Sequence, residues 1–352
     1  MLSFECDYTE GCHEKILEAF ARVNREQYPG YGNDPFTASA KEKIKEACQC
    51  PEGDVYFLSG GTQTNAIAID SMLRPYEGVI AGTTGHINVH ESGAIEFLGH
   101  KVLTVPSYDG KIKASDVRTL IEQFWADGTY PNMVFPGMVY ISHPTELGTL
   151  YTASELTQLS SLCHEYNIPL YIDGARLAYG LMAETDVDLP LISKLADLFY
   201  IGGTKVGTLN GEALVFTKKN APANFYTIIK QHGAMLAKGR LTGIQFDTLF
   251  TDGLYYQLGR NGIERAMELR KLFTDRGIKL HIDSPTNQQF FLMENKLIHK
   301  LSENVRFEMW GPELEEATPV RFVTSWATTE AQILELEKYL DEALKSTKQN
   351  EE

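Results

Sequence analysis

The hydrophobic positions of this chain follow two periodicities in turn. Some segments place apolar residues three or four positions apart, which is the spacing of one face of a helix. Others are short, continuous apolar runs, which are typical of strands buried on both faces. The pattern predicts helices over 13–24, 38–49, 62–73, 114–124 and 152–167. It predicts strands over 54–60, 78–82, 100–106, 138–144, 168–174, 197–203 and 211–217.

Alternation of buried strands with helices favours an α/β fold, in which helices cover both faces of a mainly parallel sheet. After about residue 250 the pattern changes to a long helix, short strands and a final helix. These later elements are expected over 262–277, 289–294, 307–310, 320–327 and 329–344. We therefore expect a large domain and a smaller α+β C-terminal domain. The expected boundaries are 1–25 for an N-terminal arm and helix, 26–250 for the large domain and 251–352 for the small one.

Composition excludes several classes of partner. The formal net charge of −15 argues against a nucleic-acid or anionic-membrane partner. No run of about 18 apolar residues predicts a membrane span, and the N-terminus has no secretory pattern. The five cysteines form no C-x-x-C pair, so disulfides and structural zinc are disfavoured and a cytoplasmic location is expected. Cys48 and Cys50 are expected at a helix end or in the core.

Candidate chemistry lies where strands are predicted to end. In an open α/β sheet, ligands bind beyond the carboxyl ends of the strands. In "SGGTQTN", Gly61 and Thr62 stand at a predicted helix start, where free N–H groups could hold a phosphate. The motif is not a P-loop, and taken alone it fits an ordinary helix cap equally well.

Two charged residues follow later strands of the same predicted sheet. Asp173 in "LYIDGARL" ends a buried strand, so it must cap the turn, pair with a cation or serve a function. Lys205 in "GGTKVG" follows the next predicted strand, and the interval between the two residues has room for one helix and that strand. It could be a solvated side chain, or a desolvated amine of lowered pKa that forms a Schiff base. Together these two residues suit pyridoxal phosphate, whose ring nitrogen needs an acid and whose aldehyde needs an amine.

With these residues in this order, the sequence resembles the threonine aldolase and β-eliminating lyase family of fold-type-I pyridoxal-phosphate enzymes. The resemblance rests on motifs spread over nearly the whole chain. These motifs are "YGNDPFT", "SGGTQTN", "GHINVHESGA", "YIDGARL", "GGTKVG", "LAKGR" and "RFVTSWATT". It implies an aminotransferase-like large domain that binds pyridoxal 5'-phosphate.

The resemblance also implies roles for single residues. His86 would stack on the cofactor ring and assist proton transfer, and Asp173 would pair with the ring nitrogen. Lys205 would carry the Schiff base. Arg321, with Arg176 beside it, would bind the substrate carboxylate, which suits a forked guanidinium.

Further roles concern the phosphate and the substrate hydroxyl. Lys238 or Arg240 would reach a phosphate, in some members that of a neighbouring subunit. His143 would lie near the substrate hydroxyl, although a histidine before a proline could also be purely structural. The chain departs from the family at Cys6-Asp7, where a serine often precedes the aspartate. It departs again at Gly203-Thr204, where serines are common before the lysine.

The expected reaction is the cleavage of L-threonine or allo-threonine to glycine and an aldehyde, with His143 or His86 as the base. Alternatives are β-elimination or transamination of another small amino acid, or a non-catalytic cofactor-binding protein. The expected partners are a small amino acid and a second copy of the chain, as a homodimer or homotetramer.

Overall fold

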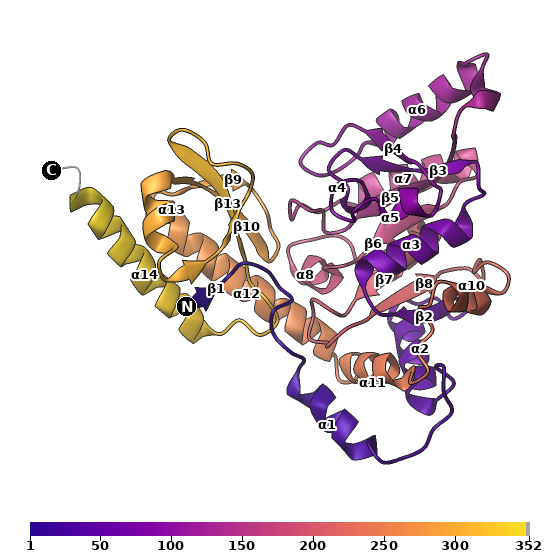
Figure 1. Cartoon of the computed structure of the whole chain (residues 1–352), viewed down its shortest axis with the longest axis horizontal. Helices are drawn as coiled ribbons and strands as arrows, with labels where there is room; N and C mark the ends of the chain where they lie inside the picture. Colours follow the sequence, from indigo (N-terminus) through magenta and orange to yellow (C-terminus); the bar gives the residue numbers. More distant parts are fainter. Residues whose placement is uncertain (350–352) are drawn as a thin grey trace.

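A computed structural model describes residues 1–349, in which the chain builds a large sheet, a smaller sheet and a two-stranded pair (Figure 1). The larger sheet has seven strands in the order β2-β8-β7-β6-β5-β3-β4. All its neighbouring pairs are parallel except those of β8, which runs antiparallel to β2 and β7. Its strands are β2 (Asp54–Leu58), β3 (Glu77–Gly82), β4 (Val102–Val105), β5 (Phe135–Ser142), β6 (Leu170–Asp173), β7 (Leu198–Gly202) and β8 (Glu212–Phe216). The predicted mainly parallel sheet is confirmed.

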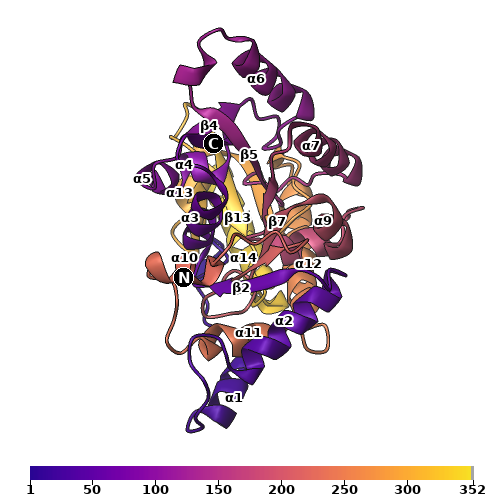
Figure 2. The same cartoon turned by 90° about the vertical axis from the view of Figure 1, so that its right-hand side faces the viewer.

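Helices cover both faces of this sheet, because successive residues of each strand point to opposite sides. In β6, Leu170 and Ile172 belong to one hydrophobic cluster and Tyr171 to another. Figure 2 shows α3 and α7 on opposite sides of the strands. The helices and the 3-10 turn of this part are α2 (Pro35–Ala47), α3 (Gly61–Met72), α4 (His86–Val89), α5 (Ala94–Phe97), α6 (Ala114–Ala126), η1 (Tyr130–Asn132), α7 (Ala153–Tyr166), α8 (Leu177–Met182), α9 (Leu189–Leu195), α10 (Phe225–Gln231) and α11 (Arg240–Leu249).

Local sequence explains where several helices begin. At α7 the side chain of Thr152 accepts from the Glu155 amide and Glu155 accepts in return, so the predicted capping box is present. Helix α2 begins three residues before the predicted start, since Asp34 caps the Thr37 amide and Pro35 suits the first helical position. Cys48 is the C-cap of α2 and, like Cys50, is buried.

The long helix of the C-terminal part is longer than predicted. Helix α12 runs from Leu254 to Thr274, whereas the expected start was residue 262. Two glycines inside the helix, Gly259 and Gly262, weaken the sequence signal. The structure explains them by close packing, because a Cβ at either position would lie 2.5 Å or less from Ala178 or Tyr179 of α8.

The smaller sheet is antiparallel, in the order β12-β13-β10-β9. The N-terminus reaches this part of the molecule, because β1 (Leu2–Ser3) pairs in parallel with β11 (Val305–Arg306), while α1 (Glu14–Val23) lies against α11. Figure 1 shows β1 beside the small sheet and α1 below the large one. Within residues 1–349 no helix has the length and apolar character needed to span a bilayer. The remaining elements are β9 (Lys279–Ile282), β10 (Gln288–Glu294), α13 (Asn295–Leu301), β12 (Glu308–Met309), β13 (Ala317–Val323) and α14 (Glu330–Gln349).

Candidate active site

A cavity of about 200 Å³ lies at the carboxyl ends of the parallel strands, where the topology places ligand sites. Six of the sequence-predicted residues line it. These are Gly61, Thr62, His86, Asp173, Arg176 and Lys205. The structure thus brings together residues that are up to 144 positions apart, from Gly61 to Lys205.

Asp173 ends β6 as a buried carboxylate with three hydrogen-bond donors. Its Oδ2 accepts from the Tyr140 hydroxyl at 2.7 Å and from Asn65 Nδ2 at 3.0 Å. Its Oδ1 accepts from the amide of Ala175 at 3.0 Å, so the carboxylate also caps the turn. These three donors fix the carboxyl group at the cavity wall. Asp173 can therefore face a cationic group in the cavity.

Lys205 stands in the turn that follows β7, with its amine partly open to the cavity. Burial and the positive charge of Arg176 lower the pKa of Lys205, against the opposing effect of Asp7, Asp173 and Glu212. A lowered pKa raises the fraction of uncharged, nucleophilic amine.

His86 begins α4 and is held by a buried acid. Its Nδ1 lies 2.7 Å from Glu91 Oε1, which also accepts from Asn65 Nδ2 at 2.7 Å. Burial lowers the pKa of His86, but the bond to Glu91 and the charges of Asp173 and Glu91 outweigh it, so the pKa is raised. Since Glu91 takes the proton on Nδ1, Nε2 is the ring atom that can accept another.

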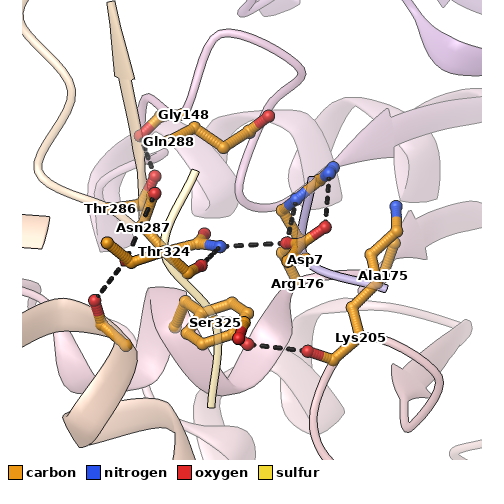
Figure 3. Close-up of polar contacts among 12 residues, drawn as sticks. Asp7, Gly148, Ala175, Arg176, Lys205, Thr286, Asn287, Gln288, Thr324 and Ser325 are labelled. Atoms are coloured by element: carbon orange, nitrogen blue, oxygen red, sulfur yellow. Dashed lines mark hydrogen bonds and ion pairs between the residues drawn. The ribbon is translucent and has the colours of Figure 1, made fainter. Parts of the chain in front are cut away.

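Arg176 joins the cavity to distant parts of the chain. Its Nε and Nη2 donate to Asp7 at 2.7 and 3.0 Å. Asp7 also accepts from Asn287 Nδ2 at 2.9 Å, so the N-terminal segment, the large sheet and the small sheet meet at one carboxylate. Figure 3 shows this pair beside Lys205.

The glycine-containing start of α3 forms another wall of the cavity. Gly60, Gly61 and Thr62 line it, and α3 has no side-chain cap on its first N–H groups. A Cβ at Gly61 would lie 3.2 Å from the Tyr200 hydroxyl, so a larger residue would narrow the site. A helix start of this kind suits an anion such as a phosphate.

The structure places His143 away from the predicted position beside a substrate hydroxyl. In β5 the side chain of Ser142 faces the cavity, and His143, the next residue, turns to the opposite face, where it packs near Tyr151. Burial and the charge of Lys111 lower the pKa of His143 to about 4. Its Nδ1 accepts from the Tyr151 amide at 3.4 Å. The geometry favours the structural alternative for this histidine.

The three remaining predicted residues also lie outside the cavity lining. Arg321 lies on β13, opposite Glu308 of β12, with which it forms an ion pair, and its Nη1 donates to Gln288 at 2.7 Å. Arg240 donates to the Glu26 carbonyl at 2.9 Å, and Lys238 is exposed. Within one chain, Lys238 and Arg240 therefore do not line the cavity beside the start of α3.

Sequence reasoning missed several residues that line the cavity or hold its lining. Asn65, which donates to Asp173 and Glu91, and Glu91 itself stand inside the quoted motifs "SGGTQTN" and "GHINVHESGA", although no role was predicted for them. Glu146 accepts from the Ser142 hydroxyl at 2.6 Å and from the His86 amide at 2.9 Å. Glu212, the first residue of β8, had no sequence signal beyond its place after a glycine-rich turn.

Comparison with known proteins decides the family. The model of the beta-eliminating lyase family matches residues 4–277. The chain belongs to the beta-eliminating lyase family. The chain is 29% identical to the low specificity L-threonine aldolase of Pseudomonas sp. (strain NCIMB 10558), over 95% of both chains. It is also similar to a solved structure of Leishmania major threonine aldolase, with a TM-score of 0.94 and 42% identity over 97% of this chain and 99% of the other.

A more distantly similar solved structure shows the fold of the chain. A Thermus thermophilus aspartate aminotransferase aligns with a TM-score of 0.71 and 15% identity, over 97% of this chain and 91% of the other. The aminotransferase-like fold predicted from the sequence is therefore confirmed. Proteins of the beta-eliminating lyase family use pyridoxal phosphate. The cavity fits that group, because it combines an amine, a buried carboxylate, an imidazole and an anion-binding helix start.

Proposed function

We propose that this chain is a pyridoxal-phosphate-dependent aldolase that cleaves L-threonine or L-allo-threonine to glycine and acetaldehyde. The observation that carries the proposal is the meeting of Asp173, Lys205 and His86 in one cavity. The full-length likeness to threonine aldolases supports the choice of substrate. The bound cofactor would supply an electron sink for the bond that breaks at the substrate α-carbon.

The residues of the cavity divide the work of holding the cofactor. Among the described residues Lys205 is the only lysine that lines the cavity, and it would provide the amine for the aldehyde of the cofactor. Asp173, oriented by its three donors, would hold a proton on the ring nitrogen. Gly61 and Thr62 would offer the start of α3 to the phosphate.

Arg176 is the residue we assign to the substrate carboxylate, with Arg321 nearby. Burial and the positive charge of Arg176 lower the pKa of Arg321. Arg176 lines the cavity and Arg321 lies outside its lining, so a substrate carboxylate bound to Arg176 would also feel the charge of Arg321. Binding there would orient the amino acid relative to Lys205.

His86 is the residue we assign to the proton of the substrate hydroxyl. It lines the cavity, and Glu91 holds its Nδ1 so that Nε2 is available as an acceptor. The raised pKa makes it a stronger base than a free imidazole. We do not assign this role to His143, because it follows β5 and does not line the cavity.

The test is an absorption spectrum of the protein with pyridoxal phosphate, followed by a product assay with threonine. We expect a visible band from the cofactor bound to Lys205, and acetaldehyde and glycine in equal amounts. Lys205→Ala should lose the band and the turnover. Release of ammonia and a keto acid instead would indicate β-elimination, and a colourless, inactive protein would refute the proposal. We further propose a cytoplasmic homodimer or homotetramer, which sedimentation would test.

A further inference from the structure

Four carboxylates line the cavity, and the first three hold or contact residues of the reaction proposed above. Asp173 is held by Tyr140 and Asn65, and Glu91 is held by His86. Glu146 accepts from Ser142 and from the backbone of His86. Glu212 is the fourth, and the reaction proposed above assigns it no role.

Glu212 is attached to the turn that carries Lys205. Its Oε2 accepts from the amide of Gly203 at 3.0 Å, and the Thr204 hydroxyl is a second donor. Both donors directly precede Lys205 in the chain. Glu212 also lies opposite Gly202 in the sheet, so β8 brings its carboxyl group to the root of the Lys205 turn.

The surroundings of Glu212 favour its neutral form. Burial is the main cause that raises the pKa of Glu212 to about 7, and the charge of Asp173 adds to it. Lys205 is the cation that acts against this rise. Any event that removes the charge of Lys205 therefore favours protonation of Glu212. The titratable groups that face Glu212 are Lys205, Asp173, Tyr171, Tyr200 and Tyr255.

We propose that Glu212 is a positioning residue for Lys205, which fixes the turn that carries the lysine and sets the proton balance of the lysine amine through its charge. Lys205 must lose a proton before its amine can bond to a carbonyl carbon. The carboxylate form of Glu212 favours the ammonium form of Lys205, and the neutral form of Glu212 favours the free amine. The two groups are therefore expected to titrate as a coupled pair.

The first test uses the protein without cofactor. Glutamate labelled with ¹³C at its carboxyl carbon gives one NMR signal for each residue, and the Glu212 signal is the one absent from Glu212→Gln. Glu212→Asp also removes this signal, which preserves the assignment if the glutamine variant does not fold. We expect titration near pH 7, whereas an ordinary glutamate titrates near ~4.3. Titration in that ordinary range would overturn the proposal.

The second test measures the proton balance at Lys205 itself. Acetylation of Lys205 by acetic anhydride, followed over pH by peptide mass spectrometry, reports the fraction of free amine. Glutamine can still accept from the Gly203 amide, so Glu212→Gln removes the charge and retains the structural contact. We expect its acetylation profile at lower pH than in the wild type, because the carboxylate raises the pKa of Lys205. Glu335→Gln, a surface control on α14, should match the wild type. An unchanged profile in Glu212→Gln would refute the coupling.

The role of Glu212 in turnover rests on the proposed function. With cofactor, Glu212→Gln should keep the visible band and shift the pH profile of kcat toward lower pH, in the same direction as its acetylation profile, because the charge that raises the pKa of Lys205 is lost. A wild-type protein without threonine cleavage would refute the proposed function, while the two cofactor-free measurements would still decide the coupling of Glu212 and Lys205.

Discussion

The pair formed by Asp7 and Arg176 offers a sharp test of how burial controls the strength of an ion pair. The Asp7 side chain is 0% exposed, and that of Arg176 is 12% exposed. Asparagine in place of Asp7 would leave the guanidinium without a counter-charge. Removing one partner of a buried pair costs about 3–5 kcal/mol of the free energy of unfolding. Asp7→Asn should therefore destabilise the protein by about that amount.

Asp247→Asn is a matched control for this prediction. Asp247 and Lys43 form an ion pair of 2.6 Å, as short as the buried pair, but their side chains are 24% and 31% exposed. Such an exposed pair contributes about 0.2–1 kcal/mol. Urea unfolding of both variants, at one protein concentration, compares the two losses in the free energy of unfolding. Equal losses in the two variants would refute the argument from burial.

The pH dependence of Asp7→Asn has a defined sign. Burial raises the pKa of Asp7, but the charges of Arg176 and Lys205 outweigh it, so the pKa is lowered. The stability that Asp7 contributes is therefore complete above the ordinary aspartate pKa of about 3.9 and is lost as pH falls below it. The difference in unfolding free energy between wild type and variant should be constant at neutral pH and shrink in acid. A difference that grew in acid would contradict the ion-pair interpretation.

Three further predictions concern single side chains. Asp173→Asn should keep the cofactor band and lower kcat by about 100-fold or more, measured by acetaldehyde release, because the charge facing the ring is lost. Glu308→Gln removes the ion-pair partner of Arg321 and should free this arginine for the substrate carboxylate. We expect KM for threonine to fall by about two- to fivefold with little change in kcat. A raised KM would contradict a role of Arg321 in substrate binding. Between pH 6.5 and about 4, His143 is neutral in the folded protein and gains a proton on unfolding. As pH falls through this range, the free energy of unfolding of the wild type, measured in urea, should decrease by up to about 3 kcal/mol. The decrease should be smaller in His143→Gln.

The candidate site was predictable to the extent that its residues follow strands. Asp173 and Lys205 each come directly after a buried apolar run, and parallel strands bring such positions to one edge of a sheet. His143 follows a strand as well, yet it does not line the cavity. Period-two alternation sends Ser142 and His143 to opposite faces, and the sequence alone does not say which face holds the ligand.

Contacts across long stretches of chain could not be predicted at all. Asp7 meets Arg176, which is 169 residues away, and Asn287, which is 280 residues away. Glu212 reaches the Lys205 turn because β8 reverses direction in an otherwise parallel sheet. Neither contact has a local pattern, since each depends on how the two sheets and the N-terminal segment pack.

The sequence by itself determined the order of helices and strands, the mainly parallel sheet and the family, because periodicity, caps and motifs are local properties of the chain. Only the tertiary structure decided which polar side chains share the cavity, which acid holds each base, and how far burial moves their pKa values. Those properties depend on distance and desolvation between residues far apart in sequence. Asp173 shows both aspects, since its place at a strand end is written in "LYIDGARL", while its donors Tyr140 and Asn65 come from the fold.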